Sequence, residues 1–215
     1  WQAHYKRAAY IDMGVGDVTL CDRTGAIYAG RTEGMNDHKS RIAERTNKRM
    51  AKTLAEAMQG ADCFIGLSAA GVCTSAMVRS MQPKAIVLAM ANPVPEIFPD
   101  EAIAAGAAVV GTGRSDFPNQ VNNVLAFPGV LRGALDTRAS DINEAMKIAA
   151  AYAIAGLVDN DKLGPEYIIP DVFDPRVAPA VAAAVAQAAM DSGVARIKVD
   201  PQAIARRTVE LVAAA

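Results

Sequence analysis

Over its first half the chain alternates short apolar runs with longer helical patterns, and this rhythm narrows the folds open to it. Aliphatic and β-branched runs mark four candidate strands, 17–21, 63–67, 85–90 and 108–111. Helical patterns cover 37–51, 53–59, 74–81 and a segment opened by Pro99 and closed by Gly106. Such apolar strands are typical of a parallel sheet covered on both faces by crossover helices. The sequence therefore predicts an α/β fold with a Rossmann-like, doubly wound, mostly parallel sheet.

Two of these helices carry N-cap signals. Asp37 and Thr53 are the predicted caps, and Glu56, three residues after Thr53, completes a capping-box pattern. Asp and Thr side chains at this position accept hydrogen bonds from the first free N–H groups of a helix.

After residue 111 the rhythm changes. A polar loop with Pro and Asn residues spans 111–129, and three helices are predicted at 142–158, capped by Asp141, at 175–190 and at 201–213. Residues 2–13 also have a helical pattern, so the sheet is expected to be truncated at its N-terminus. We predict a helical N-terminal segment at 1–15, a dinucleotide-binding domain at 16–140, and C-terminal helices at 141–215 that pack on the same domain.

Composition and charge exclude several classes of function. The net charge of -1, with basic residues scattered among acids, gives no broad field for nucleic acid. No stretch is long and apolar enough to predict a membrane span, and no apolar signal-peptide core follows the basic residues of the N-terminus. The three cysteines fit neither a disulfide framework nor zinc spacing, which favours a reducing cytoplasm. Cys21 and Cys63 lie in apolar runs and are expected to pack as small hydrophobic residues.

Asp22 follows the candidate strand 17–21. An acid at the end of the second strand of a dinucleotide-binding fold accepts hydrogen bonds from the adenosine ribose, and this is the role predicted for Asp22. Equally, Asp22 could only cap the turn that follows it. Its charge favours NAD over NADP, although Arg23 or Lys39 could offset that charge. A glycine-rich phosphate loop is missing, because Gly14 and Gly16 precede this strand instead of following one.

Small and polar residues follow the next two candidate strands. The run Ser68-Ala69-Ala70-Gly71 would let a dinucleotide approach the backbone closely, or Gly71 could only supply a positive φ in a tight turn. Asn92 stands before a proline at the end of the next strand, where it can contact a ribose, an amide or a carboxylate, or only form the turn. Ligands bind at this carboxyl edge in open α/β folds.

The loop at 111–129 has the densest group of polar side chains in the chain. They are Arg114, Ser115, Asp116, Asn119, Gln120, Asn122 and Asn123. Apolar residues flank them, among them Phe117 and Phe127, and should draw the loop inward. The sequence therefore favours a binding loop over a solvated one.

Three segments closely resemble the malic enzyme family in its bacterial short form. They are CDRTGAIYAGR at 21–31, ANPVPEI at 91–97 and GTGRSDFPNQVNNVLAFPGVLRGALDTRA at 111–139. The resemblance runs from about Gly16 to the C-terminus, while residues 1–15 do not match the family's pattern.

This resemblance implies oxidative decarboxylation of L-malate to pyruvate and CO₂, with NAD or NADP as hydride acceptor and Mg²⁺ or Mn²⁺ as Lewis acid. It assigns Asp22 to the ribose, the turn Ser68, Ala69, Ala70 and Gly71 to the cofactor, and Asn92 to the nicotinamide and substrate. It also assigns Asn123, with its neighbour Asn122, to the malate carboxylate. A homo-oligomer in the cytoplasm is expected.

The family's general acid Tyr, general base Lys and metal ligands precede every segment that matches. Tyr5, Lys6, Tyr10 and Asp12 stand in no matching context, so no catalytic residue and no metal ligand is assigned in this chain. The chain is expected to be inactive alone and to bind NAD weakly or not at all. The alternative is a non-catalytic module that retains only the fold and self-associates.

Overall fold

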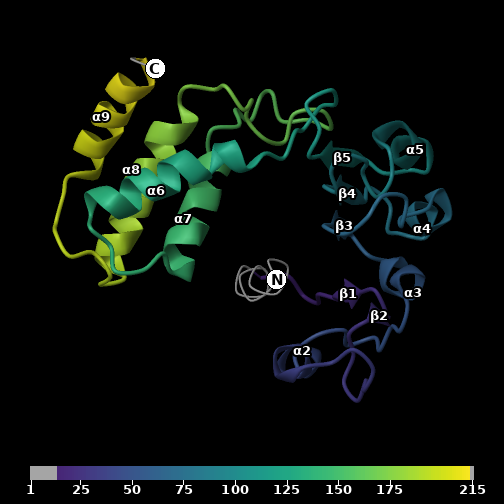
Figure 1. Ribbon diagram of the computed structural model, residues 1–215. Coiled ribbons are helices and arrows are strands. Elements are labelled where there is room, and N and C mark those ends of the chain that lie inside the picture. Colours follow the sequence, from purple (N-terminus) through teal and green to yellow (C-terminus); the bar gives the residue numbers. More distant parts are fainter. Residues whose placement is uncertain (1–13, 214–215) are drawn as a thin grey trace. The chain divides into compact units, whose positions relative to one another are not determined.

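The computed structural model describes residues 14–213, so the helix predicted at 2–13 lies outside the described residues (Figure 1). The chain divides into two compact units, which we call unit 1, up to Val110, and unit 2, from Gly111. This division falls before the domain boundary predicted at 140, because the helices on both sides of residue 140 pack with one another. The predicted functional domains themselves stay a prediction.

A three-stranded sheet organises unit 1. It has the order β3 (Cys63–Gly66), β4 (Ile86–Ala89) and β5 (Val109–Thr112), the last of which crosses the unit boundary. Strands β3 and β4 are parallel, with Cys63 opposite Ile86. These strands confirm three of the four predicted apolar runs and the parallel sheet.

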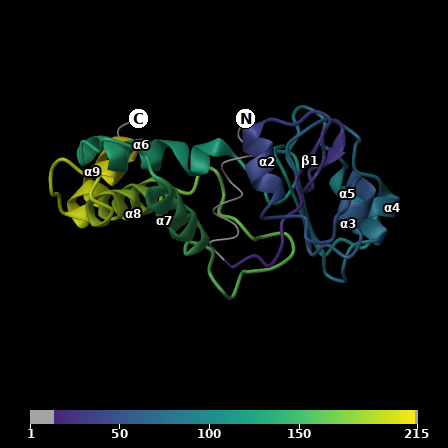
Figure 2. The ribbon, with the colours of Figure 1, turned by 90° about the horizontal axis from the view of Figure 1, so that it is seen from below.

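Three short helices accompany the sheet: α3 (Leu54–Met58), α4 (Ser75–Arg79) and α5 (Pro99–Ala104). Figures 1 and 2 show all three on the same side of the strands. Since α4 and α5 connect successive strands in the order β3-β4-β5, crossovers of one hand place them on one face. Thr53 caps α3 as predicted, because its side chain accepts a hydrogen bond from the N–H of Glu56 at 3.1 Å.

Burial alternates along β3 and β4. Phe64, Val87 and Ala89 are buried in a core with residues of the three helices. Cys63 and Ile86, on the opposite face, are exposed. Ile65 and Leu88 on that face are half-buried. The helices that connect these strands cover one face, and the predicted cover of the other face stays a prediction.

The predicted strand at 17–21 is also wrong. Instead, β1 (Cys21–Asp22) and β2 (Gly25–Ala26) form a small antiparallel hairpin. The carbonyl of Leu20 accepts from the N–H of Ile27 at 2.7 Å, so the backbone bonds of this segment close locally and not in the sheet. The reversal needs a glycine, because φ of Gly25 is +113° and a Cβ there would lie 2.4 Å from the carbonyl oxygen of Lys52.

Helix α2 (Asp37–Ala43) is shorter than predicted. Its N-cap is Asn36, whose side chain accepts from the N–H of Lys39, so the prediction of Asp37 as the cap is off by one residue. The helix ends well before residue 51 because Asn47 and Met50 have positive φ values of +52° and +56°. The buried Asn47 side chain also bonds the backbone of Ala51 in place of helical partners.

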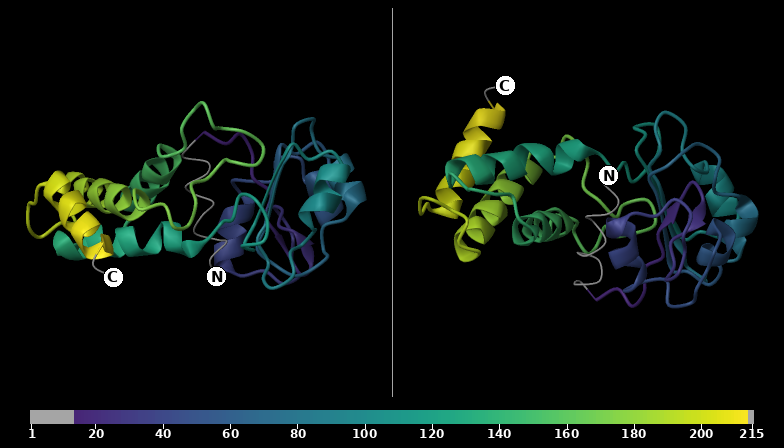
Figure 3. Two further views of the ribbon diagram at one scale, coloured as in Figure 1. Left: turned by 90° about the horizontal axis from the view of Figure 1, so that it is seen from above. Right: turned by 60° about the horizontal axis from the view of Figure 1, so that its bottom comes forward.

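Unit 2 is built from four main helices: α6 (Phe127–Asp136), α7 (Glu144–Ala155), α8 (Val177–Asp191) and α9 (Pro201–Ala213). Helix α8 contacts the other three, and Figure 3 shows the yellow α9 running beside it. Its valines are buried, and Val181 and Val185 are fully buried. Within residues 14–213, no helix combines the length and apolar character that crossing a membrane requires.

Helix α6 was not predicted, and two other boundaries differ. Gly129 and Gly133 lower the helix propensity of α6, yet they let α8 approach, because a Cβ at Gly133 would lie 2.6 Å from the Ala182 carbonyl oxygen. Helix α7 is capped by Asn143 and not by Asp141. Helix α8 begins at Val177, two residues later than predicted.

Candidate functional site

Two exposed turns lie side by side where β3 and β4 end. The first carries Ser68, Ala69, Ala70 and Gly71, all exposed, and the second carries the exposed Asn92. The turns are joined by a hydrogen bond from the Gly71 N–H to the Pro95 carbonyl at 3.2 Å. The structure therefore brings together these predicted cofactor-binding segments at the carboxyl edge of the sheet.

Glu96 is the residue that sequence reasoning missed. Its side chain is 0 % exposed, and its carboxylate accepts hydrogen bonds from the backbone N–H groups of Ser68 at 2.7 Å and Ala91 at 3.0 Å. A Cβ on Gly66 would lie 2.4 Å from the Glu96 carboxyl carbon, so the carboxylate fits only against a glycine. A glycine inside an apolar strand run was the one signal of such a close approach.

A shallow cavity of about 290 Å³ opens beside these turns. Its lining includes Gly71, Thr74, Val94, Glu96 and Phe98. Gly71 has a φ of +69°, and a Cβ built on it would meet no atom within 4 Å. The backbone of this turn is thus open to a ligand that approaches closely.

Cys73 borders the same cavity but is a poor nucleophile. It is buried, and burial together with the nearby Glu96 carboxylate raises the pKa of its thiol to about 11. The other two cysteines, Cys21 and Cys63, are exposed, so the prediction that they pack as core residues is wrong.

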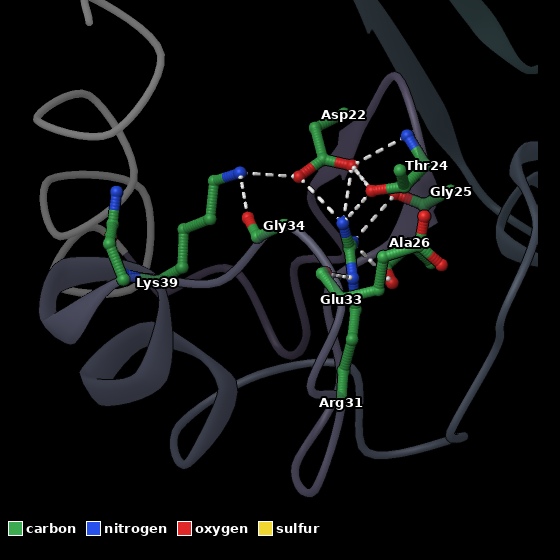
Figure 4. A network of polar contacts seen from close by, with 9 residues as sticks. Asp22, Thr24, Gly25, Ala26, Arg31, Glu33, Gly34 and Lys39 are labelled. Atoms are coloured by element: carbon green, nitrogen blue, oxygen red, sulfur yellow. Dashed lines mark hydrogen bonds and ion pairs between the residues drawn. The ribbon is translucent and has the colours of Figure 1, made fainter.

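Asp22 lies in a network of polar contacts on the β1–β2 hairpin (Figure 4). Its carboxylate accepts from Arg31 at 2.7 Å, from Lys39 at 2.6 Å, and from the N–H and hydroxyl of Thr24. Burial would raise the pKa of Asp22, but the hydrogen bonds from Lys39, Arg31 and Thr24 together hold it well below its usual range. Asp22 does cap its turn, as one of the two interpretations of the sequence has it.

The network carries more positive than negative charge. Arg31 is held by backbone carbonyls of Ala26 at 3.0 Å and Glu33 at 2.9 Å, and its side chain is only 4 % exposed. Lys39 also donates to the carbonyl of Gly34 at 2.6 Å. Because two cations surround one carboxylate, this hairpin does not present a bare negative charge.

Asn122 and Asn123 lie in unit 2, at the short 3₁₀ helix η1 (Asn123–Leu125). Asn122 is its N-cap, with its side-chain oxygen accepting from the N–H of Val124 at 3.0 Å. Asn123 is exposed. Their predicted convergence with Asn92 stays a prediction.

Asn119 has a different place in the same loop. It is buried, and its amide donates to the Pro165 carbonyl at 2.8 Å and accepts from the Ile168 N–H at 2.9 Å. The loop is thus drawn inward at Asn119, whereas Arg114 and Asp116 form an exposed ion pair.

Among residues 14–213, no group of three or more His, Cys, Asp or Glu side chains is placed to hold a metal ion. We therefore assign no ligand in the described residues to the divalent metal that the resemblance implies.

Comparisons with known proteins agree on one family. A family model described as malic enzyme, NAD binding domain, matches residues 5–190, so the expectation that residues 1–15 do not match the family is wrong from residue 5 onward. The chain is 60% identical over 199 residues to a bifunctional malic/malolactic enzyme of Bacillus subtilis, a match that covers 92% of this chain and 48% of that protein. It is 49% identical to an NAD-dependent malic enzyme of Geobacillus stearothermophilus, with 85% and 38% covered, and 55% identical to an NADP-dependent malic enzyme of Rhizobium meliloti, with 84% and 25% covered.

Solved structures give the same result. The crystal structure of the Entamoeba histolytica malic enzyme matches with a TM-score of 0.88 at 39% identity, covering 94% of this chain and 44% of that one. An NAD-dependent malic enzyme of Thermotoga maritima matches with a TM-score of 0.80 at 41% identity, covering 85% and 48%. The chain spans about half the length of the Bacillus relative and less of several others. These matches confirm the Rossmann-like fold and the predicted resemblance. The chain belongs to the malic enzyme family and corresponds to its NAD-binding domain.

Proposed function

We propose that this chain is the dinucleotide-binding part of an enzyme that converts L-malate to pyruvate and CO₂ with NAD or NADP as hydride acceptor. The observation that carries this proposal is the pair of exposed turns after β3 and β4, joined by the Gly71 to Pro95 hydrogen bond. Carboxyl ends of adjacent parallel strands are where open α/β folds bind nucleotides. The family membership supports the same chemistry.

Each turn is suited to a different part of the cofactor. The exposed run from Ser68 to Gly71 has only small side chains, and a Cβ at Gly71 would meet no atom within 4 Å, so a dinucleotide can approach this backbone closely. Asn92 is exposed, and its amide makes no hydrogen bond with the described residues, so it is available to the nicotinamide amide and the substrate. When bound, NAD or NADP accepts the hydride that leaves C2 of malate.

For the substrate, Asn122 and Asn123 are the proposed carboxylate-binding residues. Asn122 uses its side-chain oxygen as a cap acceptor, which leaves its amide NH₂ for a carboxylate oxygen. Asn123 is exposed beside it. Neutral amide donors orient a carboxylate without the strong attraction of Arg.

Asp22 is the proposed ribose contact, and Lys39 beside it bears on the choice of cofactor. Asp22 alone would repel the 2′-phosphate of NADP, but Lys39, at 2.6 Å, and Arg31 compensate its charge. We expect both cofactors to be accepted. We also propose that the chain forms a homo-oligomer.

Calorimetric titration of the chain with NAD and NADP tests the proposal. We expect binding of both at up to millimolar concentrations, and Lys39→Ala to weaken NADP at least about fivefold more than NAD, since one screened charge contact contributes about 1 kcal/mol. Lys198→Ala, an exposed lysine of unit 2, is the matched control and should change neither. No heat with either cofactor would contradict the proposed function and favour a non-catalytic module. Malate-dependent NADH formation is not expected from the chain alone.

A further inference from the structure

Glu96 is the acid at the centre of the edge where β3 and β4 end. One of its oxygens accepts from the Ser68 N–H at 2.7 Å and the other from the Ala91 N–H at 3.0 Å. Ser68 is the first residue of the proposed cofactor turn, and Ala91 directly precedes Asn92. One carboxylate therefore joins the starts of both segments that the proposed function assigns to the dinucleotide.

The backbone beside Glu96 holds the rest of the first turn. The Glu96 carbonyl accepts from the N–H of Cys73 at 3.1 Å, and the Pro95 carbonyl accepts from the N–H of Gly71 at 3.2 Å. The first turn is thus bonded near its start by the Glu96 side chain and at its end by the main chain. Between these points Ala69 and Ala70 are exposed.

Stability alone does not explain a carboxylate at this place. Glu96 is fully buried, and no Lys or Arg in the described part of the chain forms an ion pair with it. Burying an acid without a cation carries a desolvation penalty that an apolar side chain of similar size avoids. The backbone N–H groups of the two turns offset part of that penalty, as at other anion-binding backbone sites.

We propose that Glu96 is a positioning residue, which fixes the two strand-end turns in the arrangement that receives the dinucleotide. The inference rests on the proposed function, because that function assigns the turns to the cofactor. Without the carboxylate, two partly buried N–H groups lose their acceptor, and the turns reorganise to satisfy them. Cofactor affinity then falls because the binding geometry is no longer formed in advance.

The substitution Glu96→Gln tests whether Glu96 positions the two turns through its hydrogen bonds or only fills space. Gln has nearly the same shape but only one acceptor oxygen, so its NH₂ group would face either the Ser68 or the Ala91 N–H. The matched control is Asp100→Asn, since Asp100 is an exposed acid in the first turn of α5 that bonds neither turn and does not line the cavity.

Titration calorimetry with NAD, below the melting temperature of each variant, gives the first readout. We expect Glu96→Gln to bind NAD about tenfold more weakly than the unsubstituted chain, and Asp100→Asn to bind it within about twofold. Equal affinity of Glu96→Gln and the unsubstituted chain would overturn the positioning role.

Amide hydrogen exchange in the unsubstituted chain, followed by NMR, gives a second readout that needs no variant to fold. The N–H groups of Ser68 and Ala91 should be protected, while those of the exposed Ala69 and Ala70 exchange fast. Exchange at Ser68 as fast as at Ala69 would overturn the role of Glu96 whether or not NAD binds. Failure of the unsubstituted chain to bind NAD would instead overturn the proposed function.

Discussion

The strand-end turns of unit 1 and the polar loop of unit 2 are held in place by hydrogen bonds to different side-chain groups. In unit 1 a single carboxylate, Glu96, accepts from two backbone N–H groups. In unit 2 the neutral amide of Asn119 both donates, to Pro165, and accepts, from Ile168. A charged acceptor makes stronger hydrogen bonds but has a larger cost of burial than an amide. The position of Glu96 therefore depends on a closely fitted space around it, and the position of Asn119 depends on its own backbone conformation.

Local geometry bears this out at each site. Glu96 fits because residue 66 is a glycine, whereas Asn119 has a positive φ of +56°, a conformation that Asn tolerates better than most residues. Added volume should therefore disturb unit 1 most, and a change of backbone preference should disturb unit 2.

The largest effect is expected from Gly66→Ala. The new Cβ would lie 2.4 Å from the Glu96 carboxyl carbon and 2.7 Å from both oxygens, so the buried carboxylate must move away from Ser68 and Ala91. Overpacking and the lost hydrogen bonds should together lower the free energy of unfolding by about 3 kcal/mol. Urea denaturation followed by circular dichroism measures this loss.

A double substitution checks the cause. In Gly66→Ala combined with Glu96→Ala, the Cβ no longer meets a carboxylate, so the loss of stability should be clearly smaller than the sum of the two single losses. Additive losses would contradict the idea that Gly66 is required by Glu96.

Asn119→Ala should have the next largest effect. It removes both hydrogen bonds to the segment at 165–168 and places alanine in the left-handed region, for an expected loss of about 2 kcal/mol. Asn119→Gly is the matched control, because glycine accepts the positive φ. It should lose about 1 kcal/mol less in the same urea experiment. Equal losses would mean that the backbone conformation of residue 119 contributes nothing to the stability of this loop.

The parts of the molecule that could be predicted rest on local signals. The strands β3, β4 and β5 follow from apolar runs, and the cap Thr53 follows from a side chain that bonds an N–H three residues on. The turns after β3 and β4 could be placed at one edge because parallel strands end there together.

The parts that could not be predicted depend on contacts between distant residues. Glu96 bonds Ser68 across 28 positions, and Asn119 bonds Ile168 across 49, so nothing near either residue reveals its partner. Helix α6 was missed because Gly129 and Gly133 are poor helix formers, and their value lies in the close approach of α8. Lys39 was predicted as a possible partner of the Asp22 charge, but Arg31 was not, because its contact with Asp22 needs the hairpin to be formed.

The smallest effect is expected at Asp22. Unlike the Glu96 carboxylate, the Asp22 carboxylate is partly solvated and paired with two cations. Since the pKa of Asp22 is lower in the folded chain than its ordinary value of 3.8, its contribution to stability is present above that pH and is lost as the pH falls below it. Asp22→Asn should therefore reduce the free energy of unfolding by about 1 kcal/mol at neutral pH, and the difference from the unsubstituted chain should shrink at about pH 3. Asp116→Asn, which breaks an exposed ion pair, is the control and should change stability less. An Asp22→Asn loss that is the same at both pH values would show that its carboxylate charge contributes nothing to the hairpin.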